Sequence, residues 1–346
     1  MITKIIPEEK IISVLKSINK AAKIAIVTHK SPDGDAIGSS LALYHFLFSQ
    51  EKETTVIVPD SFPKYLDILP SSSEILVYEG NETQVIETIK QCDLVFCLDF
   101  NNLKRIGKLN THIAGSNAKK IMIDHHPDFI EFADITISHS EIASTSELIF
   151  RLICRMGYFS EMTNETAECI CAGMLTDTGG LAFNSNSPEI YTIFAELLRK
   201  GVDKDSLYRH LYNNYSENRM RLMGYVLAEK MKIYPEYHTA IVALDKSDLE
   251  KYDYQTGDTE GFVNMPLNIK GVTISALFSE KEDHIRVSLR SSDDFSVNKF
   301  SKKYFNGAGH ERAAGGKLYI SVEEVPQYFE KSLKAVFDKQ KRAQDL

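Results

Sequence analysis

Short unbroken runs of apolar residues alternate with amphipathic segments through the first half of the chain. The apolar runs lie at 23–29, 54–59, 74–78, 93–99, 119–124 and 133–137. Each has the length of a strand, and the segments between them have the spacing of helices. Unbroken apolar strands separated by helices are typical of a parallel sheet that is buried on both faces. The pattern therefore predicts an N-terminal α/β domain with helices on both sides of a parallel sheet.

Helix-capping residues mark the ends of three predicted helices in the next part of the chain. Ser144 with Glu147 forms a capping-box pattern at the start of a helix that stops at Gly157. A second helix begins near residue 164 and is expected to end near Asp177, where glycines follow. A third has Ser187 as its N-cap and Pro188 in its first turn.

The pattern changes after residue 203. Residues 204–234 are helical in pattern and rich in charge and tyrosine, which indicates a helical connector. A smaller block follows, with strands that alternate more strongly, the glycine-rich segment NGAGHERAAGGKL and a final amphipathic helix. We expect a C-terminal α/β domain with a mixed sheet. The predicted division is 1–203 for the first domain, 204–235 for the connector and 236–346 for the second domain.

Composition and charge narrow the choice of partners. The chain has 346 residues, 43% of them apolar, and a net charge of −8. An acidic chain is poorly suited to long duplex DNA, because a basic face supplies most of that affinity. The five cysteines include no CxxC pair, which favours reduced thiols. No apolar run approaches the roughly 18 residues of a membrane span, and the charged N-terminus does not resemble a signal peptide, so we expect a cytoplasmic protein without membrane contact.

Acidic and imidazole side chains gather where the predicted strands end. In open α/β sheets, ligands bind at the carboxyl ends of the strands. Four separate segments offer potential metal ligands there: HKSPDGD, a strand-terminal aspartate, an Asp-His-His run and an Asp-Thr-Gly-Gly turn. The residues concerned are His29, Asp33, Asp35, Asp99, Asp124, His125, His126 and Asp177.

The number of carboxylates predicts two divalent cations. Four negative charges, on Asp33, Asp35, Asp99 and Asp177, would be neutralised by two such ions. Gly34 separates Asp33 from Asp35, so these two side chains can turn to different ions. Carboxylate and imidazole ligands suit Mn²⁺, and also Mg²⁺, Co²⁺ or Zn²⁺, whereas the lack of thiolate ligands argues against a structural zinc.

These segments resemble a known family. SPDGDAIGSS, CLDF, IDHHPDF and GMLTDTGG are similar to motifs one to four of the DHH phosphoesterase superfamily, and NGAGHERAAGG resembles the GGGHxxAAG signature of the DHH-associated C-terminal domain. The resemblance covers nearly the whole chain. In length and domain pair, the chain looks most like the small nanoRNase/pAp-phosphatase branch, the NrnA-like proteins.

The resemblance implies a role for each site residue. His29 and Asp33 would hold one metal, Asp35 and His125 the other, Asp99 would bridge both, and Asp177 would complete the second site. The implied catalytic residues are Asp99, His126, which would face the substrate phosphate, and Asp124, which would orient a ligand histidine. The two ions would activate a water for in-line attack on phosphorus.

A phosphate-binding role is expected of the C-terminal domain. Arg290 can clamp a phosphate with two hydrogen bonds, and Gly307, Gly309 and the turn at His310 can present backbone amides to an anion. Ser288 lies beside Arg290, and Arg105 is a further candidate in the first domain. Ala308 stands where the family commonly has glycine. Together, these groups predict a pocket for a terminal phosphate that faces the metals.

The predicted function is hydrolysis of very short phosphate esters. The expected substrates are 5′-phosphorylated RNAs of a few nucleotides, the linear dinucleotides pApA and pGpG, and 3′-phosphoadenosine-5′-phosphate (pAp), with AMP or GMP as products. An exopolyphosphatase or inorganic pyrophosphatase is the alternative enzyme. A non-catalytic nucleotide sensor is disfavoured because all six metal-ligand positions are filled, and RNA binding by the C-terminal domain is disfavoured by the net charge. The resemblance leaves a homodimer open.

Overall fold

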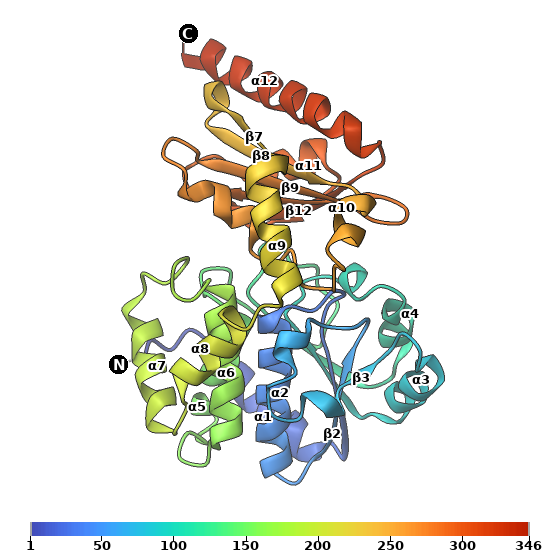
Figure 1. Cartoon of the computed structure of the whole chain (residues 1–346). Coiled ribbons are helices and arrows are strands. Elements are labelled where there is room, and N and C mark those ends of the chain that lie inside the picture. The colour runs from blue at the N-terminus through green and yellow to red at the C-terminus, as the bar shows by residue number, and fades with distance from the viewer. Residues whose placement is uncertain (1, 345–346) are drawn as a thin grey trace. The chain divides into compact units, whose positions relative to one another are not determined.

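The computed structural model describes residues 2–344, which form two compact units divided between Asn214 and Tyr215 (Figure 1). The boundary between the units falls inside the predicted connector, 204–235. The division into three parts stays a prediction, and residues 345–346 of its last part lie outside the described residues.

The first unit is built on a six-stranded parallel sheet, as the apolar runs predict. The sheet has the order β3-β2-β1-β4-β5-β6, and each pair of neighbours is parallel. The edge strand β3 is shorter than the apolar run at 74–78, because residues 72–74 form a 3-10 turn and only β2 pairs with it. The strands are β1 (Lys23–Val27), β2 (Glu53–Val58), β3 (Leu76–Val77), β4 (Leu94–Leu98), β5 (Lys119–Asp124) and β6 (Ile135–Ser138).

Helices cover both faces of this sheet. In β1, Ile24 and Ile26 pack into one core while Ala25 and Val27 pack into the other, because successive side chains of a strand point to opposite faces. Figure 1 shows α3 and α4 together on one side and α2 with α6 on the other. The helices on the α2 side are α1 (Glu8–Lys20), α2 (Gly34–Ser49), α5 (Thr145–Arg155), α6 (Asn164–Asp177), α7 (Pro188–Arg199) and α8 (Lys204–Tyr212), and those on the opposite side are α3 (Glu82–Gln91) and α4 (Leu109–Gly115).

The second unit contains a mixed six-stranded sheet, which confirms the predicted fold class. Its order is β11-β12-β10-β9-β8-β7; β8 and β9 are parallel, and the other pairs are antiparallel. The strands are β7 (Met231–Tyr234), β8 (Thr239–Leu244), β9 (Ile274–Glu280), β10 (Ile285–Ser291), β11 (Ala308–Gly309) and β12 (Ala313–Leu318).

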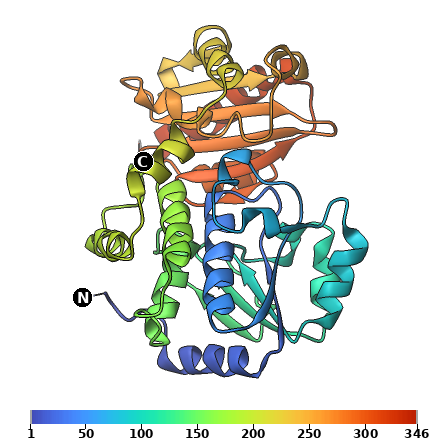
Figure 2. The same cartoon turned by 60° about the horizontal axis from the view of Figure 1, so that its bottom comes forward.

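Two cores flank the second sheet. Phe300 of α11 (Val297–Tyr304) and Phe329 of α12 (Val325–Gln344) pack into one core, and Leu222 of α9 (Glu217–Tyr225) and Leu249 of α10 (Lys246–Lys251) pack into the other. Seen from a second direction, the sheet of this unit is again a continuous layer (Figure 2). None of the helices in the described chain is long and apolar enough to cross a membrane.

The connector differs from its sequence prediction. Residues 204–234 are not one helical segment: α8 ends at Tyr212, α9 begins at Glu217, a π-helix spans Val226–Lys230, and the last four residues form β7. β7 pairs with β8, and Tyr234 is buried in the core of the second unit. The strand forms because this pairing gives its backbone hydrogen-bond partners, a tertiary effect that overrides the local helical pattern.

Short 3-10 turns connect several of these elements in the described part of the chain. They lie at Lys64–Leu66, Ser72–Glu74, Leu103–Ile106, Pro235–Tyr237, Phe262–Asn268 and Val322–Glu324.

Candidate metal centre

The predicted site residues of the first unit meet at the carboxyl edge of the parallel sheet. His29 follows β1, Asp99 follows β4, and Asp124 ends β5 with His125 next to it. All four are almost completely buried, with at most 5% of their surface exposed. A cluster of carboxylates and imidazoles this far from water needs compensation by opposite charge or hydrogen bonds.

Close packing of α2 against α6 brings Asp35 and Asp177 to the same edge. Asp35 lies in the first turn of α2, and Asp177 is the last residue of α6. A Cβ atom at Gly38 would lie 2.6 Å from the Cys169 carbonyl oxygen, so only glycine permits this approach. Small residues inside the two helices therefore place two carboxylates on one site.

One group of potential ligands contains His29, Asp33 and Asp99, with ligand atoms that all lie within 4.8 Å of one another. His29 Nε2 is 3.3 Å from Asp99 Oδ2 and 3.9 Å from Asp33 Oδ1. Asp33 is also the N-cap of α2, because its Oδ1 accepts the amide hydrogens of Asp35 and Ala36.

A second group contains Asp35, His125 and Asp177, again with ligand atoms within 4.8 Å of one another. His125 Nε2 is 3.5 Å from Asp177 Oδ2 and 3.9 Å from Asp35 Oδ2. Asp33 and Asp35 thus belong to different groups of potential ligands.

Asp99 lies between the two groups. Its Oδ2 faces His29, and its Oδ1 lies 3.5 Å from His125 Nε2. Its backbone has φ of 63°, a left-handed conformation that non-glycine residues seldom adopt and that is enriched at functional sites. The geometry suits a carboxylate shared by two cations.

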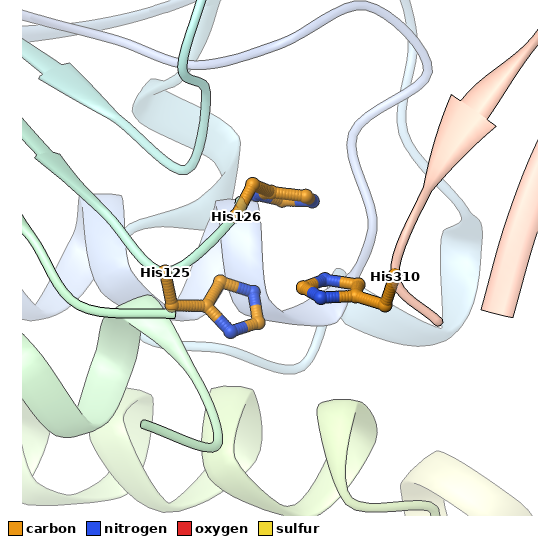
Figure 3. Close-up of side chains that lie close together, drawn as sticks. All are labelled: His125, His126 and His310. Atoms are coloured by element: carbon orange, nitrogen blue, oxygen red, sulfur yellow. The ribbon is translucent and has the colours of Figure 1, made fainter. Parts of the chain in front are cut away.

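Asp124 and His126 form a pair beside these groups. His126 Nδ1 is 2.8 Å from Asp124 Oδ1, and its amide donates to Asp124 Oδ2 at 3.0 Å. Figure 3 shows His125 and His126 next to each other beyond the end of β5, with ring centres 4.7 Å apart. The carboxylate on Nδ1 fixes the orientation of the His126 ring, with Nε2 on the side away from Asp124.

The electrostatics of the metal-free site show crowding of negative charge. Burial and the carboxylates of Asp99 and Asp177 raise the pKa of Asp35 well above its usual range. Burial and Asp99 likewise raise the pKa of Asp124 to about 7. Burial alone would lower the pKa of His125, but Asp177, Asp99 and Asp35 raise it to about 9. These shifts show that the cluster favours added positive charge, which divalent cations would supply.

The residues also fit bound cations by their hydrogen-bond pattern. His29 Nδ1 lies 2.9 Å from the Lys30 carbonyl oxygen, so Nδ1 carries the hydrogen and Nε2 presents a lone pair. This buried Nε2 has no hydrogen-bond partner among the described residues, although two carboxylates lie within 4 Å. A lone pair facing carboxylate oxygens is the arrangement of a metal ligand. Four carboxylates and two imidazoles without thiolates suit Mn²⁺, Mg²⁺, Co²⁺ or a catalytic Zn²⁺.

We expect the metal-free chain to lose stability as the pH rises from 6.5 to about 9. The pKa of His125 is raised from 6.5 to about 9, so its contribution is fully present below pH 6.5 and is lost as the pH passes through 9. For a buried group, this shift corresponds to a free energy of unfolding on the order of 3 kcal/mol. Thermal unfolding of the chelator-treated chain across this range measures the effect.

His125→Gln is the control for this pH dependence, because glutamine cannot become charged. The variant should lose much less stability over the same range. A wild-type chain that keeps or gains stability between pH 6.5 and 9, relative to this variant, would contradict the electrostatic description.

Arg105 is the one predicted substrate-binding residue in the first unit. It lies in the 3-10 turn Leu103–Ile106, and its carbonyl oxygen accepts the Lys30 amide at 2.8 Å. Its guanidinium is 3.5 Å from the Asp99 carbonyl oxygen. Arg105 therefore lies beside the segments that follow β1 and β4.

The remaining predicted substrate-binding residues lie in the second unit. Ser288 and Arg290 are on β10, opposite Gly315 and Ala313 of β12. Gly309 is on β11, and His310 follows it.

The glycine-rich segment differs in part from the prediction that its backbone amides are available to an anion. The Gly307 amide donates to Ser301 O at 3.3 Å, and the His310 amide donates to Ala313 O at 2.7 Å. A Cβ atom at Gly307 would lie 1.8 Å from Gly315 O, so this glycine is required for backbone packing. These two amides already donate to carbonyl oxygens of the same unit. The predicted phosphate binding therefore depends on the side chains of Ser288, Arg290 and His310.

Two features of the centre were missed by the sequence analysis. The first is the contact of α2 with α6, for which glycines inside helical patterns are the only signal. The second is the start of α5, whose Thr145 and Ser146 amides donate to Asp35 at 2.6 and 2.9 Å. The capping-box pattern marks this helix start correctly, but only half of the box forms: Ser144 accepts the Glu147 amide, while the Glu147 carboxylate binds Arg151.

Two family models match the chain. Residues 23–174 match the DHH family, N-terminal domain, and residues 237–338 match the DHHA1 domain. The two matches lie in the first and second unit respectively.

Curated relatives match along nearly their full length. The bifunctional oligoribonuclease and PAP phosphatase NrnA of Thermus thermophilus is 30% identical over 95% of this chain and 93% of its own length. The protein of the same name from Bacillus subtilis is 28% identical over 88% and 92%.

Solved structures share the architecture. An exopolyphosphatase-related protein from Bacteroides fragilis is 52% identical and superposes with a TM-score of 0.92 over 96% of this chain and 98% of its own. RecJ of Thermus thermophilus in complex with Mn²⁺ has 12% identity and a TM-score of 0.57 over 96% of this chain and 54% of its own, which shows a shared fold only.

These matches agree with the strand-end aspartates, the Asp-His-His run and the mixed second sheet. The chain belongs to the DHH family, carries a DHHA1 domain and is a hydrolase of the phosphoesterase class.

Proposed function

We propose that the chain hydrolyses very short oligoribonucleotides, linear dinucleotides such as pApA and pGpG, and pAp, with two divalent cations, most simply Mn²⁺. The observation that carries this proposal is Asp99, whose two carboxylate oxygens face two separate groups of ligands 3.3 and 3.5 Å away. The names of the relatives from Thermus thermophilus and Bacillus subtilis support the substrate class.

The proposed ligands follow the two groups. His29, Asp33 and Asp99 would hold one ion, and Asp35, His125 and Asp177 would hold the other with Asp99 shared. When bound, two such ions activate a water and offset charge on the phosphoryl oxygens.

The protein's own residues would orient the substrate. His126, with Nδ1 held by Asp124 at 2.8 Å, would donate from Nε2 to a phosphoryl oxygen. With its ring oriented by Asp124, His126 would present Nε2 to a phosphoryl oxygen, and a protonated ring would donate a hydrogen bond to charge that develops there. Arg105, beside Asp99, would bind a further phosphoryl oxygen.

The second unit would supply recognition of a terminal phosphate. Arg290 has a planar guanidinium that can form two parallel hydrogen bonds with phosphate. Ser288 lies two residues before it on β10, so both side chains point to the same face of the sheet. We propose these two residues with His310 as the phosphate-binding set, and Gly307 and Gly309 as glycines that shape the segment.

A second candidate function is hydrolysis of polyphosphate or pyrophosphate. The 52% identical protein from Bacteroides fragilis is described as exopolyphosphatase-related, which favours this alternative for the same metal centre. Both reactions use the same attack on phosphorus, so the substrate and not the site geometry separates them.

A substrate panel tests the proposal. With Mn²⁺ present, we expect turnover of pAp, pApA and a five-nucleotide RNA, little release of phosphate from pyrophosphate or polyphosphate, and loss of activity in Asp99→Ala. Rapid hydrolysis of polyphosphate with no activity on the three nucleotide substrates would replace the proposed function by the alternative.

A further inference from the structure

The start of α5 lies against two carboxylates of the proposed metal centre, those of Asp99 and Asp35. Thr145 is the first residue of the helix, follows the N-cap Ser144 and is completely buried. Its hydroxyl Oγ1 lies 2.9 Å from Asp99 Oδ1. Its amide and that of Ser146 lie 2.6 and 2.9 Å from the two oxygens of Asp35. One turn of helix thus holds a carboxylate from each of two distant segments.

The Thr145 hydroxyl is the donor in its bond with Asp99. Asp99 accepts this bond at Oδ1, the oxygen that also faces His125, while Oδ2 faces His29. The bond therefore restrains rotation of the carboxylate about its last torsion, which is otherwise broad. With the plane fixed, one oxygen points to each ligand group.

The surrounding packing leaves room for this arrangement. A Cβ atom at Gly173 of α6 would lie 1.9 Å from Ser146 Oγ and 2.9 Å from Asp35 Oδ1. Only glycine at this position allows the first turn of α5 to approach Asp35. The contact is thus built by α5 and α6 together.

We propose that Thr145 is a positioning residue of the metal centre. Its hydroxyl holds the Asp99 carboxylate in the orientation that serves two cations, and the amides of Thr145 and Ser146 hold Asp35 for the second. This inference rests on the proposed two-cation site. Residues that orient ligands in this way typically change metal affinity about 10–100-fold when their hydrogen bond is removed.

Four side chains at position 145 separate the hydroxyl from packing. Threonine and serine have the hydroxyl, whereas valine and alanine lack it; threonine and valine are β-branched, whereas serine and alanine are not. The experiment titrates Mn²⁺ into the metal-stripped wild-type chain and into Thr145→Ser, Thr145→Val and Thr145→Ala by calorimetry. Thr166→Val, a buried threonine in the first turn of α6 about 16 Å along the helix from Asp177, is the matched control.

The proposal predicts that affinity follows the hydroxyl. Thr145→Val and Thr145→Ala should bind Mn²⁺ about 10–100-fold more weakly, with Thr145→Ser and Thr166→Val within about threefold of the wild type. If Thr145→Val fails to fold, the alanine and serine variants, which differ by one oxygen atom, give the same comparison.

Three outcomes would overturn the inference. Affinity that follows β-branching would make Thr145 a packing residue. Unchanged affinity in the folded valine or alanine variant would remove the role of the hydroxyl while leaving the metal centre intact. A wild-type chain that binds no Mn²⁺ would overturn both this inference and the proposed function.

Discussion

Asp99→Asn should reduce hydrolysis of pAp and of short RNA by at least about 10³-fold, the upper range for loss of one preorganised electrostatic group. Asparagine keeps the shape of the side chain but removes its charge and one of its two acceptor oxygens. Because Asp99 faces His29 on one side and His125 on the other, both proposed cation sites should weaken together. Steady-state kinetics with Mn²⁺ at several concentrations measure the effect.

Asp93→Asn is the matched control for this prediction. Asp93 immediately precedes β4 and Asp99 immediately follows it, so both substitutions lie at the ends of one strand. The Asp93 carboxylate accepts the amides of Ala22 and Lys23, away from the metal centre. We expect nearly wild-type turnover from it. Equal losses in the two variants would mean that Asp99 acts through the strand and not through the site.

His126→Gln should lower kcat by about 10²–10³-fold while leaving the affinity for Mn²⁺ nearly unchanged. The reason is the hydrogen bond of Nδ1 with Asp124, which directs Nε2 away from that carboxylate and leaves it for the proposed contact with substrate phosphate. Kinetics under saturating Mn²⁺ and a calorimetric Mn²⁺ titration, run on the same sample, separate the two effects.

His139→Gln removes a comparable imidazole that belongs to none of the potential ligand groups among the described residues. His139 follows β6, the neighbour of β5, and its Nδ1 is 2.9 Å from Glu141 Oε1, so it too is held by an acidic side chain. This variant should keep its kcat. If His126→Gln instead loses Mn²⁺ affinity in proportion to its kcat, His126 is a metal ligand, a role that its proximity to Asp99 and Asp124 also permits.

Sequence patterns predicted the parts of the centre that belong to strand ends. The carboxyl ends of parallel strands share one edge, so His29, Asp99 and the Asp124–His126 run could be expected together without knowledge of the strand order. The apolar runs were sufficient to locate these strand ends, because a strand that is buried on both faces is almost continuously apolar.

The contribution of the helices was harder to predict. Asp177 reaches the carboxyl edge of the sheet because Gly38 allows α2 to pack closely on α6. The distance between two packed helices cannot be predicted from a sequence pattern. The contact of the Thr145 hydroxyl with Asp99 could not be predicted from the capping-box pattern either, because the same pattern begins many helices that contact no ligand. Both depend on tertiary contacts between segments more than 40 residues apart.

Local patterns misled in the second half of the chain. The helical pattern of 204–234 includes β7, whose pairing with β8 decides its conformation. The glycine-rich segment suggested amides available to an anion, yet the Gly307 and His310 amides bond to backbone carbonyls. Glycine in this segment allows two backbone segments to approach closely. A glycine-rich sequence of this kind looks the same whether it packs against backbone or binds an anion.

Anomalous scattering from a crystal grown with Mn²⁺ tests most directly whether Asp99 joins two cation sites. We expect two Mn²⁺ ions per chain, about 3.5–4 Å apart as in two-metal hydrolases, each in contact with one oxygen of Asp99. A single ion, or two ions that do not share Asp99, would contradict the account.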